Sequence, residues 1–437
     1  MNDLNRCTTL CAVSLAFLLS AAAASTQGTP RLELTPDTVL MDEPFRMAVS
    51  GLKPGQRVTI RVDGNRGVWQ ASETFQSDSR GRVDVPDPMK FIWSATQTAE
   101  RPLAKAAGAG QGIQPWVFTA EVDGQVVATG TVTRRVMAAD VRAVPVRERG
   151  LVAVAYYPAD AQPRPAIIVV GGSGGGMPGP AVAGGLASRG YAVLALAYFN
   201  AEGLPAFLNN IPLEYFAAAV DWLKSQSFVE PTRIGLIGNS RGGELALLLG
   251  ATYPSAFRVI VAYVPSSVIW PGLSDDSETP AWTLNGKPLA SVPSRFTEAD
   301  LTLPGRERFL KRMQDKSALA RAAIPVERLN AALLMFSGKD DQLWPSDVFA
   351  AQIVERLKSR NFAHPVEHYS YEHAGHMIAR PYVPTFDVRR VRVHPVSKRP
   401  NIAGGTPEGQ ARANEDSWQK LLAFLDKYLT VQRRSGG

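Results

Sequence analysis

The stretch that most constrains this chain is residues 234–249, which read Ile-Gly-Leu-Ile-Gly-Asn-Ser-Arg-Gly-Gly-Glu-Leu-Ala-Leu-Leu-Leu. A strand-length apolar run enters it and a helix-forming run leaves it, so a sharp turn must join the two. Gly238 and Gly242 flank the turn serine, where a Cβ would clash with the adjoining strand or helix. This G-x-S-x-G turn predicts that the Ser240 hydroxyl stands clear as a nucleophile, with a helix N-terminus behind it that favours negative charge.

A serine nucleophile needs a base, and the α/β-hydrolase fold supplies the partners in the order serine, acid, histidine. The acid is expected after a later strand, where residues 333–345 read Leu-Leu-Met-Phe-Ser-Gly-Lys-Asp-Asp-Gln-Leu-Trp-Pro. Members of this fold commonly read Gly-x-x-Asp before a turn proline, and this resemblance favours Asp341, with Asp340 as the alternative. The base is predicted to be His376, which follows a glycine in the loop after an expected strand, and His373 is its rival.

An oxyanion hole is expected from two backbone N–H groups. One is the N–H of Arg241, the residue after the nucleophile. The other comes from the glycine-rich run at 171–176, where Ser173 or Gly174 is the expected donor. This run lacks the Lys-Ser/Thr of a P-loop, so we do not expect nucleotide binding. The sequence shows no metal-ligand spacing, and a serine triad needs neither a metal nor another cofactor.

The motif lies in a segment with a βαβα rhythm, which predicts an α/β fold with a doubly wound sheet. We expect a catalytic domain over residues 139–432. Residues 265–323 interrupt the rhythm with many Pro, Ser and Trp residues and are interpreted as an insertion over the active site. The expected strands are 166–170, 191–197, 234–237, 259–263, 331–336 and 366–369, and the expected helices are 180–189, 213–225, 346–360, 408–430 and one from Gly242.

Residues 30–138 have a different pattern, in which short alternating apolar and polar runs are separated by turn signals such as Lys53-Pro54-Gly55 and Asp123-Gly124. Such spacing is typical of an antiparallel sandwich, so an immunoglobulin-like β-sandwich domain is predicted before the catalytic domain. Two domains also agree with the 437 residues, since one domain has about 100–200.

Residues 1–24 are predicted to be a cleaved signal peptide. Arg6 precedes an apolar run from Thr9 to Ala23, and small residues at its end fit the cleavage rule. The run is shorter than the about 20 residues of a spanning helix, so no stable membrane span is expected. The predicted location is therefore periplasmic or secreted. Cys7 and Cys11 both lie in this leader, which leaves the mature chain without disulfides or cysteine ligands.

The formal net charge is +7, and the basic residues are scattered rather than clustered with aromatic residues. That distribution is typical of a solvated surface and argues against nucleic-acid binding, while attraction of an anionic substrate stays open. The sequence has no internal repeats, and it predicts no particular oligomeric state.

Beyond the fold, the chain resembles the acyl-CoA thioesterase / bile acid-CoA:amino acid N-acyltransferase family over nearly its whole mature length. The resemblance lies in motifs at residues 41–45, 51–58, 91–94, 194–200, 281–289, 338–344 and 375–378. It implies a β-sandwich followed by an α/β-hydrolase domain, with the family's serine, aspartate and histidine at Ser240, Asp341 and His376. Conjugating members of that family use cysteine as the nucleophile, so serine here favours hydrolysis.

The leading hypothesis is therefore a serine hydrolase that cleaves small-molecule acyl thioesters through an acyl-Ser240 intermediate. The predicted export conflicts with a coenzyme A substrate, which makes an exported carboxylesterase or amidase the first alternative. Acyl transfer to an amine, as by an acyl-CoA:amino acid N-acyltransferase, is the second alternative. A non-catalytic carbohydrate- or envelope-binding protein is the third, and the complete set of triad residues argues against it.

Overall fold

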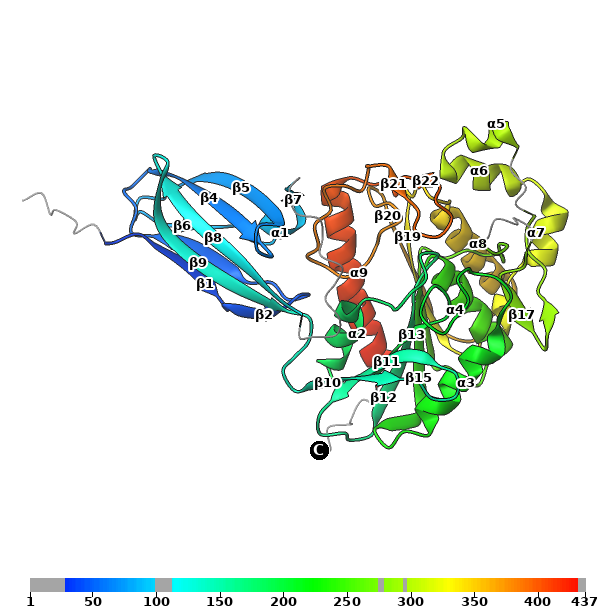
Figure 1. The fold of residues 1–437 in the computed structure, drawn as a ribbon. Coiled ribbons are helices and arrows are strands. Elements are labelled where there is room, and N and C mark those ends of the chain that lie inside the picture. Colours follow the sequence, from blue (N-terminus) through cyan, green and yellow to red (C-terminus); the bar gives the residue numbers. More distant parts are fainter. Residues whose placement is uncertain (1–27, 99–111, 274–278, 294–296, 431–437) are drawn as a thin grey trace, which may run out of the picture.

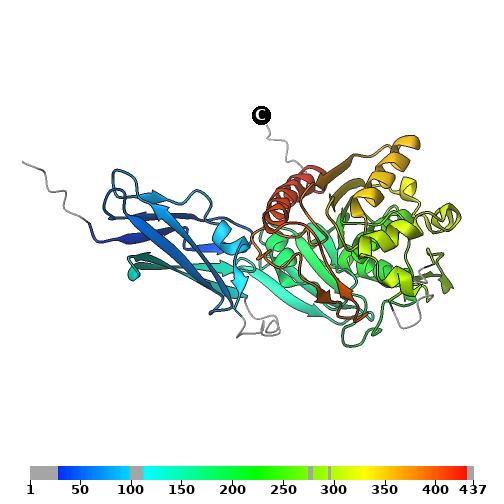
Figure 2. The same ribbon diagram turned by 90° about the horizontal axis from the view of Figure 1, so that it is seen from above.

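The computed structural model describes residues 28–98, 112–273, 279–293 and 297–430 (Figure 1). The predicted leader at 1–24 lies outside these residues. An N-terminal part made of β-strands lies beside a larger part in which helices surround a central sheet, as the second view also shows (Figure 2). Within the ranges described, no helix combines the length and the hydropathy that a bilayer crossing demands.

The central sheet has eight strands in the order β10-β11-β13-β12-β15-β16-β19-β20. All pairs from β13 to β20 are parallel, while β10 and β11 add an antiparallel edge. The predicted α/β fold with a doubly wound sheet is confirmed. The strands are β10 Val141–Val146, β11 Val152–Pro158, β12 Arg164–Val170, β13 Ala192–Ala197, β15 Val229–Asn239, β16 Val259–Tyr263, β19 Ala332–Gly338 and β20 Val366–Tyr371.

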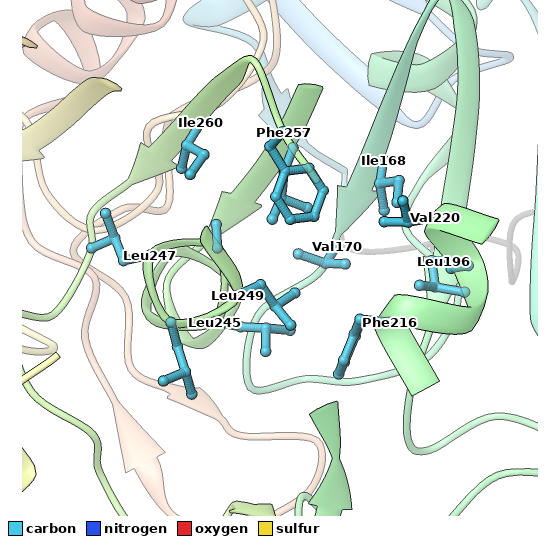
Figure 3. Close-up of a cluster of buried hydrophobic side chains, with 14 of the residues drawn as sticks. Ile168, Val170, Leu196, Phe216, Val220, Leu245, Leu247, Leu249, Phe257 and Ile260 are labelled. Carbon is cyan, nitrogen blue, oxygen red and sulfur yellow. The ribbon is translucent and has the colours of Figure 1, made fainter. Parts of the chain in front are cut away.

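Helices cover both faces of this sheet, which explains the long apolar runs in its inner strands, such as 166–170 and 192–197. Ile168 and Val170 of β12 face the core shared with α3 (Leu213–Lys224), α4 (Arg241–Thr252) and α8 (Ser346–Ser359). Their neighbours Ile167 and Val169 face the opposite core, shared with α2 (Pro180–Ala187) and α9 (Pro407–Tyr428). Figure 3 shows the first core, with Phe216 and Val220 of α3 and Leu245 and Leu249 of α4 gathered beside β12.

The N-terminal part consists of two sheets that share a buried core. The smaller has the order β1-β3-β6 and the larger β2-β9-β8-β4-β5-β7; the strand β2 pairs parallel to β9, so the arrangement is not purely antiparallel. The immunoglobulin-like assignment stays a prediction. The elements are β1 Arg31–Thr35, β2 Thr38–Leu40, β3 Arg46–Ser50, β4 Arg57–Gly64, β5 Trp69–Gln76, β6 Val83–Asp84, α1 Lys90–Trp93, β7 Thr96–Gln97, β8 Ile113–Val122 and β9 Gln125–Arg135.

The two parts are joined by hydrogen bonds from buried polar groups. The indole Nε1 of Trp418 on α9 donates to Asp42 Oδ2 at 2.8 Å, and Arg189 Nη2 pairs with the same carboxylate at 2.7 Å. Arg134, which is 2% exposed, donates to the carbonyl of Tyr382. Because an unpaired buried charge is costly, these contacts fix the N-terminal sheets against the α/β part.

The remaining short elements lie outside the central sheet, and most of them belong to residues 265–323 and 379–406 (Figure 1). The first segment forms a small separate core around Trp270, which it shares with Trp344 and with Phe349 of α8. The elements here are β14 Ile211–Pro212, β17 Trp282–Leu284, β18 Lys287–Pro288, α5 Glu298–Leu301, α6 Gly305–Arg312, α7 Lys316–Ala322, the 3-10 turn Val326–Arg328, β21 Arg392–Val393 and β22 Pro400–Asn401. A hairpin-like segment over 391–402, formed around β21 and β22, had no counterpart among the predicted elements.

Candidate active site

Ser240 stands in a strained turn between β15 and α4. Its backbone has φ 58° and ψ −120°, a conformation that a residue with a side chain rarely adopts. Its N–H donates to the carbonyl of Tyr263 on the neighbouring strand at 2.9 Å, which anchors the turn to the sheet. The sharp turn predicted from G-x-S-x-G is therefore present, and the hydroxyl projects from the carboxyl end of the parallel sheet.

The flanking glycines allow backbone to pack directly on backbone. A Cβ on Gly238 would lie 1.8 Å from the carbonyl oxygen of Gly242, and one on Gly242 would lie 2.4 Å from the carbonyl oxygen of Gly171. No side chain fits at either position. The turn and the glycine-rich run that begins at Gly171 are thus held in contact by main-chain atoms alone.

His376 lies between Ser240 and Asp341. Its Nε2 is 2.8 Å from Ser240 Oγ, and its Nδ1 is 2.9 Å from Asp341 Oδ2. The imidazole is 5% exposed, and its backbone N–H donates to the carbonyl of Ala403 at 2.9 Å. The structure therefore brings together the three side chains that the sequence selected. The rival His373 is exposed, and its backbone carbonyl accepts a hydrogen bond from the N–H of Thr406.

The two adjacent aspartates have different surroundings. Asp341 is fully buried, and its Oδ1 accepts the N–H groups of Leu343 at 3.0 Å and Trp344 at 3.2 Å. These bonds leave Oδ2 directed at His376. Asp340 instead accepts from Arg389 at 3.1 Å and from the N–H of Gly405 at 3.0 Å. Asp341, and not Asp340, is the residue that contacts the histidine.

The glycine-rich run forms a tight turn beside the nucleophile. The N–H of Gly175 donates to the carbonyl of Gly172 at 3.2 Å, which places Ser173 and Gly174 at the centre of a β-turn. A Cβ on Gly172 would lie 3.6 Å from Ser240 Oγ, so the turn adjoins the hydroxyl. Ser173 lines the cavity in front of Ser240. A Cβ on Gly174 would instead lie next to Pro395.

A cavity of about 770 Å³ opens at Ser240. Its wall is mostly apolar, with three arginines and one histidine, and no acidic residue is among the lining side chains that the structure describes. Much of the wall comes from residues 270–273, 302–309 and the hairpin segment 391–402, and residues 342–344 add to it. The lining side chains include Ser173, Phe207, Ser240, Arg241, Trp270, Leu273, Leu303, Arg308, Phe309, Leu343, Trp344, Val391, His394, Val396, Arg399 and Ile402.

Sequence reasoning missed the cavity residues Arg308, His394 and Arg399. The hairpin that carries His394 and Arg399 has no regular apolar period, so no pattern marked it as part of the site. Arg308 lies on α6, inside the predicted insertion, and nothing local separates it from the other basic residues there. Among the residues described, no three His, Asp or Glu side chains group as metal ligands.

Family models match most of the chain. Residues 42–148 match the one described as "Acyl-CoA thioester hydrolase/BAAT N-terminal region". Residues 211–431 match "BAAT / Acyl-CoA thioester hydrolase C terminal".

Similar proteins include acyl-coenzyme A thioesterase 1 of Mus musculus, which is 31% identical over 411 residues covering 89% of this chain and 94% of that protein. Acyl-coenzyme A thioesterase 5 of Mus musculus is 31% identical and covers 90% of this chain and 95% of its own. Mitochondrial acyl-coenzyme A thioesterase 2 of Homo sapiens is 30% identical over 89% of this chain and 82% of its own. A solved structure, the acylaminoacyl peptidase of Pyrococcus horikoshii, has a TM-score of 0.43 at 14% identity, covering 74% of this chain and 49% of that one.

Behind the nucleophile lies a buried ion pair that the sequence did not predict. Arg241, expected to serve only through its N–H, donates from Nη2 to the carbonyl of Trp270 at 2.8 Å and lies 3.3 Å from Glu244 Oε1. Glu244 is fully buried and also accepts from the indole of Trp282 at 2.8 Å. Burial raises the pKa of Glu244 from 4.5 to about 7, and Arg241 offsets only part of that rise.

This raised pKa predicts how stability depends on pH. The folded state holds the Glu244 proton more tightly than the unfolded chain, so this group makes the folded state lose stability as pH rises from 4.5 to about 7. The variant Glu244→Gln has no such proton to release. We expect its free energy of unfolding to decline less than that of the wild type between pH 5 and 7. Urea titrations of both proteins at several pH values measure this, and equal slopes would contradict it.

Proposed function

Because the chain belongs to the acyl-CoA thioester hydrolase/BAAT family and is a thioester hydrolase, we propose that it works through an acyl intermediate on Ser240. The observation that carries this mechanism is the position of His376, within hydrogen-bond distance of both Ser240 and Asp341. A histidine so placed can remove the serine proton while the carboxylate stabilises the imidazolium that forms.

In the first step, Ser240 Oγ attacks the thioester carbonyl carbon and its proton passes to His376 Nε2. The carbonyl π electrons move to the oxygen, which becomes an oxyanion. The N–H groups of Arg241 and of Ser173 or Gly174 are its proposed donors, since none of them is taken up by a hydrogen bond among the described residues. When the oxyanion collapses, the C–S bond breaks and the thiolate takes the proton from His376.

In the second step, water attacks the acyl-Ser240 carbonyl and gives its proton to His376. Collapse of this second oxyanion breaks the bond to Ser240 Oγ, which recovers its proton from His376, and the carboxylic acid leaves. Throughout, Asp341 keeps Nδ1 protonated, so that Nε2 is the nitrogen that exchanges protons with substrate and serine. The N–H bonds to Asp341 Oδ1 hold the carboxylate in that orientation.

The cavity supports an anionic thioester such as a coenzyme A ester. Its apolar wall suits an acyl chain, and Arg308 and Arg399 suit negatively charged groups. Burial lowers the pKa of Arg308, and repulsion from the positive charge of Arg399 lowers it further. An anion between them would relieve that repulsion.

The triad proposal predicts different effects for neighbouring residues. Ser240→Ala and Asp341→Asn should each lower kcat by about 10³-fold or more. The first removes the nucleophile, and the second lets the His376 imidazole adopt the wrong tautomer. Asp340→Asn is the matched control and should stay close to the wild type. The measurements are acyl-thioester hydrolysis and labelling of Ser240 by a fluorophosphonate. A wild type that neither hydrolyses the thioester nor is labelled would contradict the serine mechanism. Equal losses of activity in Asp340→Asn and Asp341→Asn would contradict the assignment of Asp341 as the triad acid.

The charged cavity predicts how substrates are distinguished. The double variant Arg308→Gln/Arg399→Gln should raise KM for a coenzyme A thioester by about tenfold or more, because charge-assisted hydrogen bonds to the substrate are lost. The same acyl group on N-acetylcysteamine, a neutral thiol, should be affected much less. Arg360→Gln, an exposed charge change at the end of α8, is the control. A loss of equal size on both substrates would contradict the assignment.

Residues 1–24 lie outside the described structure, and we propose that they direct export and are removed. The mature protein from its native host is then expected to begin near Ser25, as N-terminal sequencing would show. An intact Met1 would contradict export.

A cleaved product would favour the alternative of an exported carboxylesterase. Parallel assays on simple acyl esters and coenzyme A thioesters would distinguish that activity from thioester hydrolysis. Product analysis with an added amine acceptor tests acyl transfer, which the serine nucleophile disfavours.

A further inference from the structure

We propose that the Ser173 hydroxyl is a third hydrogen-bond donor to the oxyanion, and that His394 is the positioning residue that directs it. The inference rests on the proposed acyl-Ser240 mechanism. It assigns a role to the hairpin segment 391–402, which the triad leaves without one. Both side chains line the cavity that opens at Ser240.

The hydrogen bonds of His394 fix which of its nitrogens carries the proton. Its Nδ1 accepts the backbone N–H groups of Val396 at 3.2 Å and Ser397 at 3.0 Å. A proton on Nδ1 would point at two donors, so Nδ1 must be the bare nitrogen and Nε2 must carry the hydrogen. Burial and the nearby Lys398 also lower the pKa of His394, in agreement with a neutral ring.

This tautomer determines what the Ser173 hydroxyl can do. His394 Nε2 lies 2.9 Å from Ser173 Oγ, so the imidazole is the donor and the serine oxygen the acceptor. A hydroxyl has one proton to donate, and here that proton cannot point back at the histidine. No second hydrogen bond of the Ser173 side chain is present within the described part of the chain. The proton is therefore available to a group in the cavity.

The location of Ser173 suits the oxyanion. The preceding residue, Gly172, is so close to the nucleophile that a Cβ there would lie 3.1 Å from Ser240 Cβ. The turn is held by two further bonds, from Tyr198 to the carbonyl of Gly171 at 2.8 Å and from Asn200 to the carbonyl of Gly174 at 2.9 Å. A donor on a preorganised turn beside the nucleophile is the arrangement that stabilises a developing oxyanion.

The hairpin is itself ordered around His394. The His394 N–H donates to the carbonyl of Arg399 at 2.9 Å, and its carbonyl accepts from the N–H of Lys398 at 3.0 Å. Val396, which follows two residues later, is buried. The backbone and both ring nitrogens of His394 are thus hydrogen-bonded. These bonds hold the imidazole in one orientation, in which it links the hairpin to the turn at Ser173.

The experiment measures hydrolysis and transition-state binding in Ser173 and His394 variants. Ser173→Ala should lower kcat by about 10–100-fold with KM little changed, because the donor acts on the oxyanion and not on the bound thioester. Ser173→Thr keeps a hydroxyl and should recover most of the loss. Affinity for an alkyl boronic acid, which forms a tetrahedral anionic adduct on Ser240, should fall in parallel with kcat.

His394→Ala should lower kcat in the wild type but add little in the Ser173→Ala background, because the histidine acts through that hydroxyl. The matched control is Ser337→Ala, which breaks a second Ser–His pair, between Ser337 Oγ and His368 Nε2 at 2.8 Å, away from the cavity lining. It should change the melting temperature without changing kcat.

Several results would overturn the inference while leaving the proposed function intact. These are an unchanged kcat in a folded Ser173→Ala, losses that add fully in the double variant, or boronate affinity that stays constant. Failure of the acyl-Ser240 mechanism would appear separately, as full activity in Ser240→Ala. If Ser173→Ala does not fold, Ser173→Gly, which also removes the hydroxyl, takes its place in the same comparison.

Discussion

The main-chain contact between the nucleophile turn and the glycine-rich turn is the constraint on which the site depends. Gly238 packs on the backbone of Gly242, and Gly242 packs on the backbone of Gly171, so neither Gly238 nor Gly242 admits a Cβ. This contact permits the strained backbone of Ser240 and brings the N–H groups of two turns to one side of its hydroxyl. A larger residue at Gly238 or Gly242 would push the two turns apart and so separate the nucleophile from its oxyanion donors.

The histidine loop is braced from α9 by residues spaced one helical turn apart. Gln410 accepts the N–H of Gly375, next to His376, at 3.1 Å, and Asn414 accepts the N–H of Ala379 at 3.0 Å. One turn further on, Trp418 donates to Asp42 in the N-terminal part. Residues at i, i+4 and i+8 share one helix face, so this stripe connects the catalytic loop to the N-terminal sheets. The β-strand part thereby supports the site without contributing a lining residue to the described cavity.

The cavity concentrates positive charge from Arg241, Arg308 and Arg399. Arg241 is paired with the buried Glu244, and the pair ties the nucleophile helix to Trp270 in the cavity wall. A buried ion pair adds little net stability, yet losing one partner is costly because the other charge stays buried. The pair therefore serves orientation more than stability. Arg308 and Arg399 lie at the cavity surface, where they favour an anionic substrate.

The sequence alone determined the fold class, since apolar runs of strand and helix length depend only on local period. It also selected Ser240, Asp341 and His376, because each follows a parallel strand and such strand ends meet at one edge of the sheet. It kept Asp340 as the alternative to Asp341, because two adjacent aspartates in one turn look alike in the sequence. Only the tertiary structure decided between them, through the N–H groups of Leu343 and Trp344 that orient Asp341. The roles of His394, Arg308 and Arg399 likewise depend on contacts between segments far apart in the chain, which no local pattern encodes.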